Sequence, residues 1–301
     1  MIMKKIRFIV NPISGHHNKE KFPGLVEKHI DKSQFEYEIV LTECSGHATE
    51  LAKEAVGRGI DIIAAVGGDG TINETAQALI GTDTTFVIVP FGSGNGLARH
   101  LHLPLDAKKI ITEVINRGET IRIDTCRLNE RPFLSIAGAG FDAAIADGFA
   151  KDPHRGFSTY FRVIVDKYFK YRPDTMRIRL DDGEVMECAP LFVTFANSNQ
   201  FGYNAKISPK ASLTDGLIDI CIFDKPKIIS LPRLGTLLMT GHIDLAKKTL
   251  KILKARKVSV FRKEAAVVNI DGEPVMTDKD FTIEVIPSSL KLMVKHSQPC
   301  R

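Results

Sequence analysis

The sequence predicts two domains, a doubly wound and mostly parallel α/β domain followed by an antiparallel, β-rich domain. The chain has 301 residues, which is more than one compact core usually needs and suits two domains. Roughly the first 125 residues alternate short β-rich runs with helical patterns, which is typical of a parallel sheet. From Thr120 onward, strand-like runs follow one another and are separated mostly by Gly, Asp and Asn turns, which favours antiparallel pairing.

Four strands and four helices are expected in the first domain. The third strand is apolar on both faces, as a central strand of a parallel sheet should be, and Pro90 stops the fourth. The expected strands are Ile6–Val10, Phe35–Leu41, Ile60–Val66 and Phe86–Val89, and the expected helices lie near Lys19–Asp31, His47–Arg58, Thr71–Ile80 and Leu105–Arg117.

The second domain is expected to hold a series of strands interrupted by two helices. A last strand, Leu290–Val294, could return to either domain. The other strands are Ile121–Leu128, Phe133–Ala137, Thr175–Leu180, Val185–Phe195, Leu217–Phe223, Val258–Arg262, Ala265–Ile270 and Phe281–Val285, and the helices lie near Ser158–Tyr171 and Ile228–Met239.

The composition is that of an ordinary globular protein, with 44% hydrophobic and 26% charged residues. The five cysteines are scattered without metal-ligand spacing, which indicates reduced thiols in a cytoplasm and disfavours a zinc site. The N-terminus lacks the apolar core of a signal peptide, and no apolar run reaches the roughly 18 residues of a membrane helix. The net charge of +5 suits anionic ligands or surfaces. We therefore expect a cytoplasmic protein whose membrane contact is peripheral, at the inner face.

The segment Gly67–Thr71, with the sequence GGDGT, is predicted to bind phosphate at the start of a helix. Its glycines let backbone N–H groups approach phosphate oxygens. Thr71 and Glu74 match a capping box, so the helix is expected to begin at Thr71 and to present its positive end to the anion. Asp69 would repel phosphate, and its place here makes sense if it holds Mg²⁺ or a water on Mg²⁺. The alternative is a strand-to-helix turn without a ligand.

A second glycine-rich turn, Pro90–Arg99, follows the fourth strand and also leads into a helical pattern. Asn11–Gly15 ends the first strand, and Thr42 ends the second. Because the carboxyl ends of parallel strands meet at one edge, these four ends would line one nucleotide crevice. The chain lacks the Walker P-loop, the protein-kinase motifs and the dinucleotide fingerprint. These absences exclude the commoner nucleotide-binding classes.

An ordered set of seven segments resembles the diacylglycerol kinase catalytic family, which includes sphingosine and ceramide kinases and bacterial lipid kinases of the DagK, YegS and BmrU type. The set covers nearly the whole chain. GGDGT alone is shared with NAD kinases and phosphofructokinases, whereas the ordered set is far more specific. The segments are NPISG at Asn11–Gly15, TECSGHATELA at Thr42–Ala52, GGDGTINE at Gly67–Glu74, PFGSGNGLAR at Pro90–Arg99, IDTCRLNERPFLSIAGAGFDA at Ile123–Ala143, SPKASLTDGLIDI at Ser208–Ile220 and IDGEPV at Ile270–Val275.

The resemblance implies transfer of the ATP γ-phosphate to a lipid hydroxyl, with Mg²⁺ as cofactor and a role in phospholipid biosynthesis. It implies a nucleotide-binding α/β domain over residues 1–124 and a lipid-substrate β-sandwich over residues 125–285, with the active site between them. It also implies that a C-terminal segment, about residues 286–301, packs back on the first domain. The whole would be a fold like that of NAD kinases and diacylglycerol kinases.

The site residues follow from the resemblance position by position. Glu273 would be the general base, and Asp69 would be catalytic through a water-mediated link to metal, with Asp124 as a further candidate for such a link. A structural Mg²⁺ would be held by Ser212, Asp215 and the carbonyl of Leu217. ATP would contact Asn11, Pro12, Ile13, Ser14, Gly15, Thr42, Gly67, Gly68, Asp69, Gly70, Thr71, Ile72, Asn73 and Ser93.

The residues themselves leave alternatives to several of these roles. A carboxylate can accept the proton of a lipid hydroxyl during attack, but Glu273 follows Asp271-Gly272, which is also typical of a hairpin turn with a solvated Glu. Asp215 suits a hard cation or an ordinary Asp-Gly turn. The eight basic residues of Lys247–Lys263 suit anionic lipid headgroups or a solvated strand face. Nucleic acid is disfavoured because the chain has no Trp.

A lipid kinase is the favoured function, with an NAD kinase-like phosphotransferase and a non-catalytic nucleotide- or lipid-binding regulator as alternatives. The second glycine-rich turn favours the lipid branch, and Asp69 and Glu273 weigh against a regulator. That turn resembles the one of sphingosine and ceramide kinases, since it lacks the Asp that diacylglycerol kinases tend to carry after Asn95. The acceptor, diacylglycerol or a sphingoid or ceramide-like lipid, therefore stays open, as does a homodimer.

Overall fold

The computed structural model describes residues 3–13, 19–151 and 157–296. The chain forms two compact units, one made of Met1–Ile123 with Ser288–Arg301 and one made of Asp124–Pro287. No helix among the described residues is long and apolar enough to cross a membrane.

A parallel sheet forms the centre of the first unit, with the strand order β2-β1-β3-β4. Neighbouring strands pair in parallel throughout. β3 and β4 are buried along their whole length, which is why their sequences are apolar on both faces. The strands are β1 (Lys4–Val10), β2 (Phe35–Leu41), β3 (Ile62–Gly67) and β4 (Thr85–Pro90).

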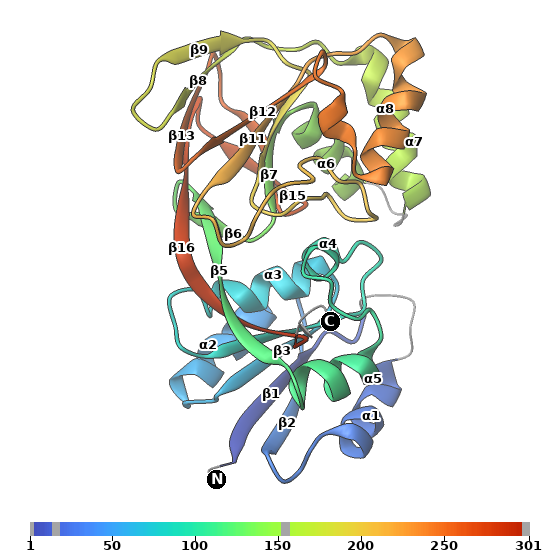
Figure 1. Cartoon of the computed structure of the whole chain (residues 1–301), viewed down its shortest axis with the longest axis vertical. Coiled ribbons are helices and arrows are strands. Elements are labelled where there is room, and N and C mark those ends of the chain that lie inside the picture. Colours follow the sequence, from blue (N-terminus) through green and yellow to red (C-terminus); the bar gives the residue numbers. More distant parts are fainter. Residues whose placement is uncertain (1–2, 14–18, 152–156, 297–301) are drawn as a thin grey trace, which may run out of the picture. The chain divides into compact units, whose positions relative to one another are not determined.

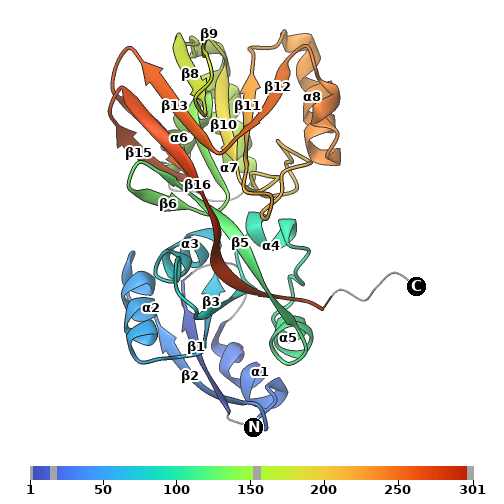
Figure 2. The same ribbon diagram turned by 60° about the vertical axis from the view of Figure 1, so that its left-hand side comes forward.

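Helices cover both faces of this sheet, so the first unit is doubly wound as the sequence predicts. Figure 2 shows α2 and α3 on one side of the strands and α1 and α5 on the other. The helices are α1 (Phe22–His29) after a short 3₁₀ turn η1 (Lys19–Lys21), α2 (His47–Gly57), α3 (Asp69–Gln77), α4 (Gly96–His100) and α5 (Ala107–Lys109), which continues as a π-helix η2 (Ile110–Ile115).

Two strands belong to both units. β5 (Glu119–Leu128) leaves the first unit for the second, and β16 (Asp280–Val294) returns; Figure 1 shows β16 as one long arrow near the C-terminal end of the chain. The first part of β16 pairs antiparallel with β13, while Leu292 near its end pairs in parallel with Phe86 of β4. The predicted strands Phe281–Val285 and Leu290–Val294 are thus one continuous strand.

Two sheets make up the second unit. One has six strands in the order β12-β11-β10-β7-β14-β15, all antiparallel. The other includes the run β16-β13-β8-β9, also antiparallel, with β5 and β6 attached. The strands not yet bounded are β6 (Arg131–Phe133), β7 (Ile136–Gly140), β8 (Met176–Leu180), β9 (Val185–Cys188), β10 (Phe192–Ala196), β11 (Ile218–Phe223), β12 (Leu250–Ala255), β13 (Lys257–Arg262), β14 (Ala266–Ile270) and β15 (Glu273–Thr277).

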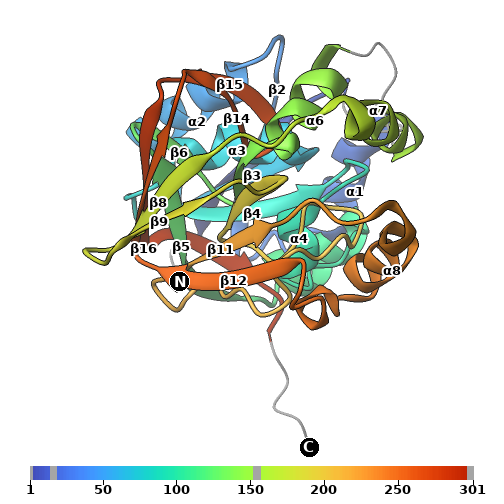
Figure 3. The same cartoon turned by 90° about the horizontal axis from the view of Figure 1, so that it is seen from above.

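Alternating side chains place the six-stranded sheet between a second sheet and a helical layer. Along β11, Ile220 and Ile222 lie in a core shared with Val258 and Ile283 of the other sheet. Phe223 points to the opposite face, into a cluster with residues of the helices. Figure 3 shows α6 and α7 next to each other in that layer. The helices are α6 (Phe141–Lys151), α7 (Phe157–Lys170) and α8 (Leu231–Thr240), with short 3₁₀ turns η3 (Ile228–Ser230) and η4 (Ile243–Leu245).

Some local predictions are wrong. The strand predicted over Phe133–Ala137 is two strands, β6 and β7, because the amides of Leu134 and Ser135 bond to the Asp271 carboxylate and leave the ladder. The strand predicted over Val185–Phe195 is also two, β9 and β10, which lie in different sheets on either side of Pro190. Helix α6 and strands β12 and β15 were not predicted.

The capping box is also wrong. Helix α3 begins at Asp69, two residues before the predicted start, with Gly68 as N-cap and no side-chain cap. The hydroxyl of Thr71 instead accepts a hydrogen bond of 3.1 Å from Asn11 Nδ2. Glu74 Oε1 accepts a long one of 3.4 Å from Ser45. Both side chains therefore link α3 to loops that follow β1 and β2.

Candidate active site

Four loops meet at the carboxyl edge of the parallel sheet in the first unit. The amide of Thr42 bonds to Val10 O at 2.9 Å, and the amide of Asn11 bonds to Val66 O at 3.0 Å. The amide of Phe91 bonds to Gly67 O at 2.7 Å. Each bond ties the residue after one strand to the last residues of its neighbour, so the loops predicted to bind nucleotide lie side by side.

Close packing explains two of the glycines in these loops. A Cβ on Gly67 would lie 2.6 Å from both Cβ and Oγ1 of Thr71, because the first turn of α3 folds back onto the end of β3. A Cβ on Gly92 would lie 2.7 Å from the Cα of Gly68. Real Cβ atoms do not approach backbone this closely, so the contact between the two glycine-rich loops excludes any side chain at position 92.

Gly70 is different, because a Cβ built there meets nothing within 4 Å among the described residues outside the backbone of its own helix. It lies in the first turn of α3, where a glycine costs helix stability relative to alanine. Packing within the protein therefore gives no reason for this glycine. Open space in front of free amides at a helix N-terminus is what an anionic ligand needs.

Asp69 joins the two glycine-rich loops. Its carboxylate accepts hydrogen bonds from the amides of Asn95 at 2.9 Å and Gly96 at 3.0 Å. Although the residue as a whole is exposed, desolvation of the carboxyl raises its pKa, while these amides and the charge of Arg99 lower it. Amide donors favour the ionised form, and each carboxylate oxygen accepts one of them. A carboxylate has about four acceptor positions, so a metal-bound water still fits.

The other predicted ATP contacts differ in what they offer a ligand. Ile13 is highly exposed and Ser93 is exposed, whereas the side chain of Ile72 is buried and leaves only its backbone. Among the described residues, Asn73 Oδ1 is one of five buried side-chain oxygens that lack a hydrogen-bond partner. Ser14 and Gly15 lie outside the described residues.

In the second unit, Glu273 is the first residue of β15 and directly follows a tight turn. Asp271 and Gly272 have φ angles of 48° and 93°, and Ile270 pairs with Glu273, which makes a two-residue hairpin of type I′. The Asp271 carboxylate accepts bonds from the amides of Leu134, Ser135 and Ile136 at 2.7, 2.9 and 2.9 Å. The turn is thereby fixed to the start of β7, while the side chain of Glu273 is exposed.

The loop that contains Ser212, Asp215 and Leu217 is built around Asp124. The Asp124 amide bonds to Leu213 O at 2.6 Å, and its carboxylate accepts the Gly216 amide at 2.7 Å. These bonds give Asp124 a structural role in the second unit that the sequence did not reveal.

A cation already stands at Asp215 in this loop. Lys254 Nζ lies 2.7 Å from Asp215 Oδ2 and 3.4 Å from Asp219 Oδ1, and the hydrogen bond to Asp215 raises the pKa of Lys254. The other Asp215 oxygen accepts the Leu217 amide at 3.1 Å. The arrangement therefore suits a positive charge, but in this structure the ammonium of Lys254 occupies the position beside Asp215 that a divalent ion would take. Among the described residues, no three His, Cys, Asp or Glu side chains form a cluster that could hold a metal ion.

Two family models match the chain in tandem. The first, the diacylglycerol kinase catalytic domain, matches residues 5–128. The second, the YegS C-terminal NAD kinase beta sandwich-like domain, matches residues 135–294. The chain belongs to the diacylglycerol kinase catalytic domain family. The resemblance found from the seven segments is thus confirmed, and so is the predicted fold class.

Individual relatives agree with this membership. A diacylglycerol kinase of Bacillus subtilis (strain 168) is 32% identical over 277 residues, which cover 90% of this chain and 90% of that protein. One of Mycobacterium tuberculosis (strain CDC 1551 / Oshkosh) is 29% identical and covers 96% and 94%. The crystal structure of a diacylglycerol kinase from Bacillus anthracis str. Sterne superposes with a TM-score of 0.74 at 20% identity over 98% of both chains, and supports the fold.

Membership in the diacylglycerol kinase family makes the chain a lipid kinase, a phosphotransferase, and implies that it uses ATP.

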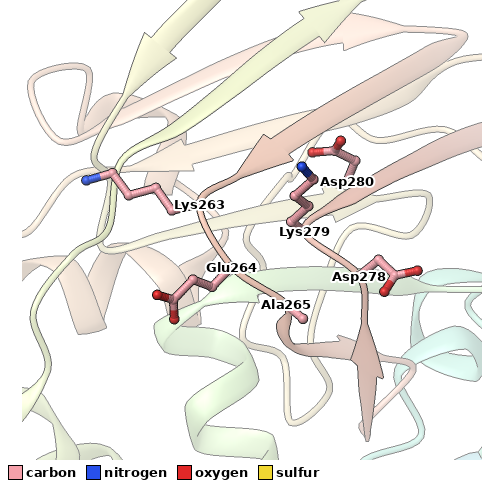
Figure 4. Close-up of a pocket in the computed structure, with 6 residues that line it drawn as sticks. All are labelled: Lys263, Glu264, Ala265, Asp278, Lys279 and Asp280. Atoms are coloured by element: carbon pink, nitrogen blue, oxygen red, sulfur yellow. The ribbon is translucent and has the colours of Figure 1, made fainter.

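The second unit also has a surface hollow of about 640 Å³ (Figure 4). Its residues belong to the connections from β13 to β14 and from β15 to β16: Lys263, Glu264, Ala265, Asp278, Lys279 and Asp280. It lies at the opposite end of the β14–β15 hairpin from Glu273, because Ala266 pairs with Thr277 there, and it contains none of the predicted site residues.

Sequence reasoning missed three contributors to these sites. Lys254 was counted only as part of a basic run, and Asn269 and Asp142 were not singled out. Asn269 is bonded both to Asp142 and to the turn before Glu273. The signal that could have found Asp142 is a carboxylate between apolar residues, in Gly140-Phe-Asp-Ala143, since such a group is seldom buried without a partner.

Proposed function

We propose that the chain transfers the γ-phosphate of ATP to the hydroxyl of a membrane lipid. Its relatives are diacylglycerol kinases, which favours diacylglycerol as the acceptor, and a sphingoid or ceramide-like lipid is the second candidate because of the Gly92–Gly96 turn. The proposal assigns ATP to the loops of the first unit and the acceptor to the second unit. An NAD kinase-like activity is the alternative to exclude, and presenting NAD and lipid extract to the enzyme in parallel decides between them.

The open space at Gly70 is the observation that supports ATP binding most directly. Gly67 and Gly92 are required by packing within the protein, whereas Gly70 is not. Phosphate oxygens at the α3 N-terminus would accept hydrogen bonds from backbone amides and gain from the helix dipole. Asp69 would keep the second glycine-rich loop in place beside the phosphates, since its carboxylate accepts two amides of that loop.

In the proposed reaction, the acceptor oxygen attacks the γ-phosphorus as the bond from that phosphorus to the β–γ bridging oxygen breaks. ADP leaves with the bond's electron pair, and the hydroxyl proton passes to the Glu273 carboxylate. The exposed position of Glu273, at the end of a rigid two-residue turn, leaves its side chain accessible to an acceptor. Glu273→Gln removes the proton acceptor, so turnover of [γ-³²P]ATP should be lost while ATP binding persists.

Mg²⁺ is part of the proposal as the partner of the ATP phosphates, whose charge it would neutralise when bound. Asp69 would hold it through water, since both carboxylate oxygens already bond to amides. The structural site proposed at Ser212, Asp215 and Leu217 would have to displace Lys254 from Asp215. No step of the reaction depends on that second site.

The basic segment Lys247–Lys263 is a weaker membrane candidate than its charge suggests. It forms β12 and β13, and Lys254 and Lys257 are paired with acidic side chains. Arg262 bonds to the carbonyls of Ala266 and Asp278. The exposed remainder is Lys247, Lys248, Lys251, Arg256 and Lys263. Sedimentation with liposomes, with and without anionic lipid, tests whether these five side chains bind headgroups.

Gly70→Ala separates phosphate binding from folding. Outside the backbone of α3, the added methyl meets no atom of the described residues within 4 Å. It also replaces a glycine in a helix, so stability should stay equal or rise by about 0.5–1 kcal/mol. If phosphate occupies the space, the ATP affinity should fall at least about tenfold, which is about 1.4 kcal/mol. Gly57→Ala in α2 is the matched control, since its Cβ is equally free. Unchanged ATP affinity in Gly70→Ala would refute the assignment.

The acceptor is identified by incubating the enzyme with [γ-³²P]ATP and a total lipid extract and separating the labelled lipids. Labelled phosphatidic acid supports diacylglycerol, and a labelled sphingoid or ceramide phosphate supports the second candidate. No labelled lipid, together with labelled NADP from NAD, would overturn the lipid proposal in favour of the alternative.

A further inference from the structure

A carboxylate without a predicted role is buried in the second unit. Asp142 lies in the first turn of α6 and is only 4% exposed. Its Oδ2 accepts a hydrogen bond of 3.1 Å from Asn269 Nδ2. The pKa of Asp142 is raised to about 6, because the effect of burial outweighs the opposing effect of the hydrogen bond from Asn269. Keeping an ionised group in such a place is costly, which calls for a reason beyond packing.

The neighbouring strand is shaped to accept this carboxylate. Gly138 of β7 pairs with Asn269 of β14, and a Cβ on Gly138 would lie 1.8 Å from Asp142 Oδ2. The carboxylate therefore rests directly on the backbone of β7. A glycine in a buried strand interior weakens the strand, and here its absence of a side chain lets α6 reach Asn269.

Asn269 also bonds to the turn before Glu273. Its Oδ1 accepts the amide of Gly272 at 2.9 Å. An amide side chain can present either its oxygen or its nitrogen in a given direction, but a carboxylate can only accept. Asp142 thus requires Asn269 to point Nδ2 toward it, which leaves Oδ1 for Gly272. The amide of Gly272 can only donate, so both neighbours of Asn269 favour the same orientation of its side chain.

We infer that Asp142 and Asn269 are positioning residues that hold the Asp271-Gly272 turn and thereby direct Glu273 for phosphoryl transfer. The inference rests on the proposed role of Glu273. Asp271 fixes one side of the turn through the amides of β7, and Asn269 fixes the other through Gly272. A displacement of about 1 Å in a catalytic group can cost on the order of a hundredfold in rate, so a turn fixed on both sides matches what a general base requires.

Isosteric exchanges test this chain of contacts without creating a cavity. Asn269→Asp places two carboxylates 3.1 Å apart and should lower kcat at least about tenfold, with KM for ATP unchanged. Asp142→Asn keeps an acceptor for Asn269, so its kcat should fall less than that of Asn269→Asp. The double exchange Asp142→Asn/Asn269→Asp swaps donor and acceptor and still leaves an oxygen for Gly272, so kcat should recover.

The background variant Glu273→Gln distinguishes positioning from general stability. If the pair acts through Glu273, Asn269→Asp should not lower the small residual rate of Glu273→Gln any further, because residues that act as one unit are not additive. Thermal midpoints are measured for every variant, so that a loss of folded protein is not mistaken for a loss of rate.

Three outcomes overturn the inference. They are a wild-type kcat in Asn269→Asp, no recovery in the double exchange, and a loss in Asn269→Asp that multiplies with that of Glu273→Gln. Failure of the proposed function gives a different result, since Glu273→Gln alone would then keep the wild-type kcat. In that case Glu273 is not the base, and the pair has nothing to position.

Discussion

Replacing Asp142 by Asn should stabilise the protein at neutral pH, although it removes a native charge. The pKa of Asp142 is raised to about 6 from 3.8, so the folded state binds the proton more tightly than the unfolded chain. The protein therefore loses stability as pH rises through the window between the pKa of the unfolded chain and that of the folded protein. One pKa unit corresponds to about 1.4 kcal/mol, so the full loss above pH 6 is about 3 kcal/mol.

The asparagine variant has no such pH-dependent loss, and its advantage over wild type should therefore grow with pH. Linkage gives an advantage of roughly 1 kcal/mol at about pH 4.5 and about 3 kcal/mol at about pH 7.5. Comparing the two proteins at each pH cancels the titration of all other groups. The hydrogen bond from Asn269 can persist, because the amide oxygen of the variant is also an acceptor.

Urea unfolding followed by circular dichroism measures the difference at both pH values. The reasoning is refuted if Asp142→Asn is no more stable than wild type near pH 7.5, or if its advantage is the same near pH 4.5. The first result would mean that the carboxylate is solvated in the folded protein. The second would mean that the gain comes from packing and not from the removal of a buried charge.

Two further predictions concern the loops. Gly92→Ala places a Cβ 2.7 Å from the Gly68 backbone, so it should cost about 1–3 kcal/mol by overpacking and weaken ATP binding; urea unfolding and ATP titration check this, and wild-type values in both would contradict the close approach of the loops. Lys254→Met removes the cation beside Asp215 and the buried Asp219, so the thermal midpoint should fall and Mg²⁺ should raise it more in the variant than in wild type. An equal Mg²⁺ effect in both proteins would show that Lys254 does not compete with the metal.

The parts of the fold that the sequence predicted are those specified by short-range patterns. The buried strands β3 and β4 are continuous apolar runs, and the glycine-rich loops after them carry their signal in adjacent residues. The break at Pro190 was also visible locally and was overlooked. The start of α3 was misplaced because Thr71 matches a capping box, while in the structure its hydroxyl is taken by Asn11, 60 residues earlier. Local rules give way when a distant partner competes for the same group.

The contacts that hold the proposed site together could not be predicted for the same reason. Asp142 and Asn269 are 127 residues apart, and Asp271 bonds to amides about as far away along the chain. Lys254 lies in a run of basic residues, and nothing in that run marks it as the partner of Asp215. Which polar groups meet depends on the register of β7, β10, β11 and β14, and a single sequence does not specify that register.

Two aspartates hold the proposed catalytic elements in the same way. Asp69 accepts two amides of the second glycine-rich loop, and Asp271 accepts three amides at the start of β7. A carboxylate suits this task because it only accepts and can take several donors at once. Loss of activity in an Asp69→Ala variant would therefore not identify a metal ligand, since the second loop would lose two hydrogen bonds together. Asp69 differs here from Glu273, whose exposed carboxylate has no such structural duty, so that Glu273→Gln reports more directly on the chemistry of phosphoryl transfer.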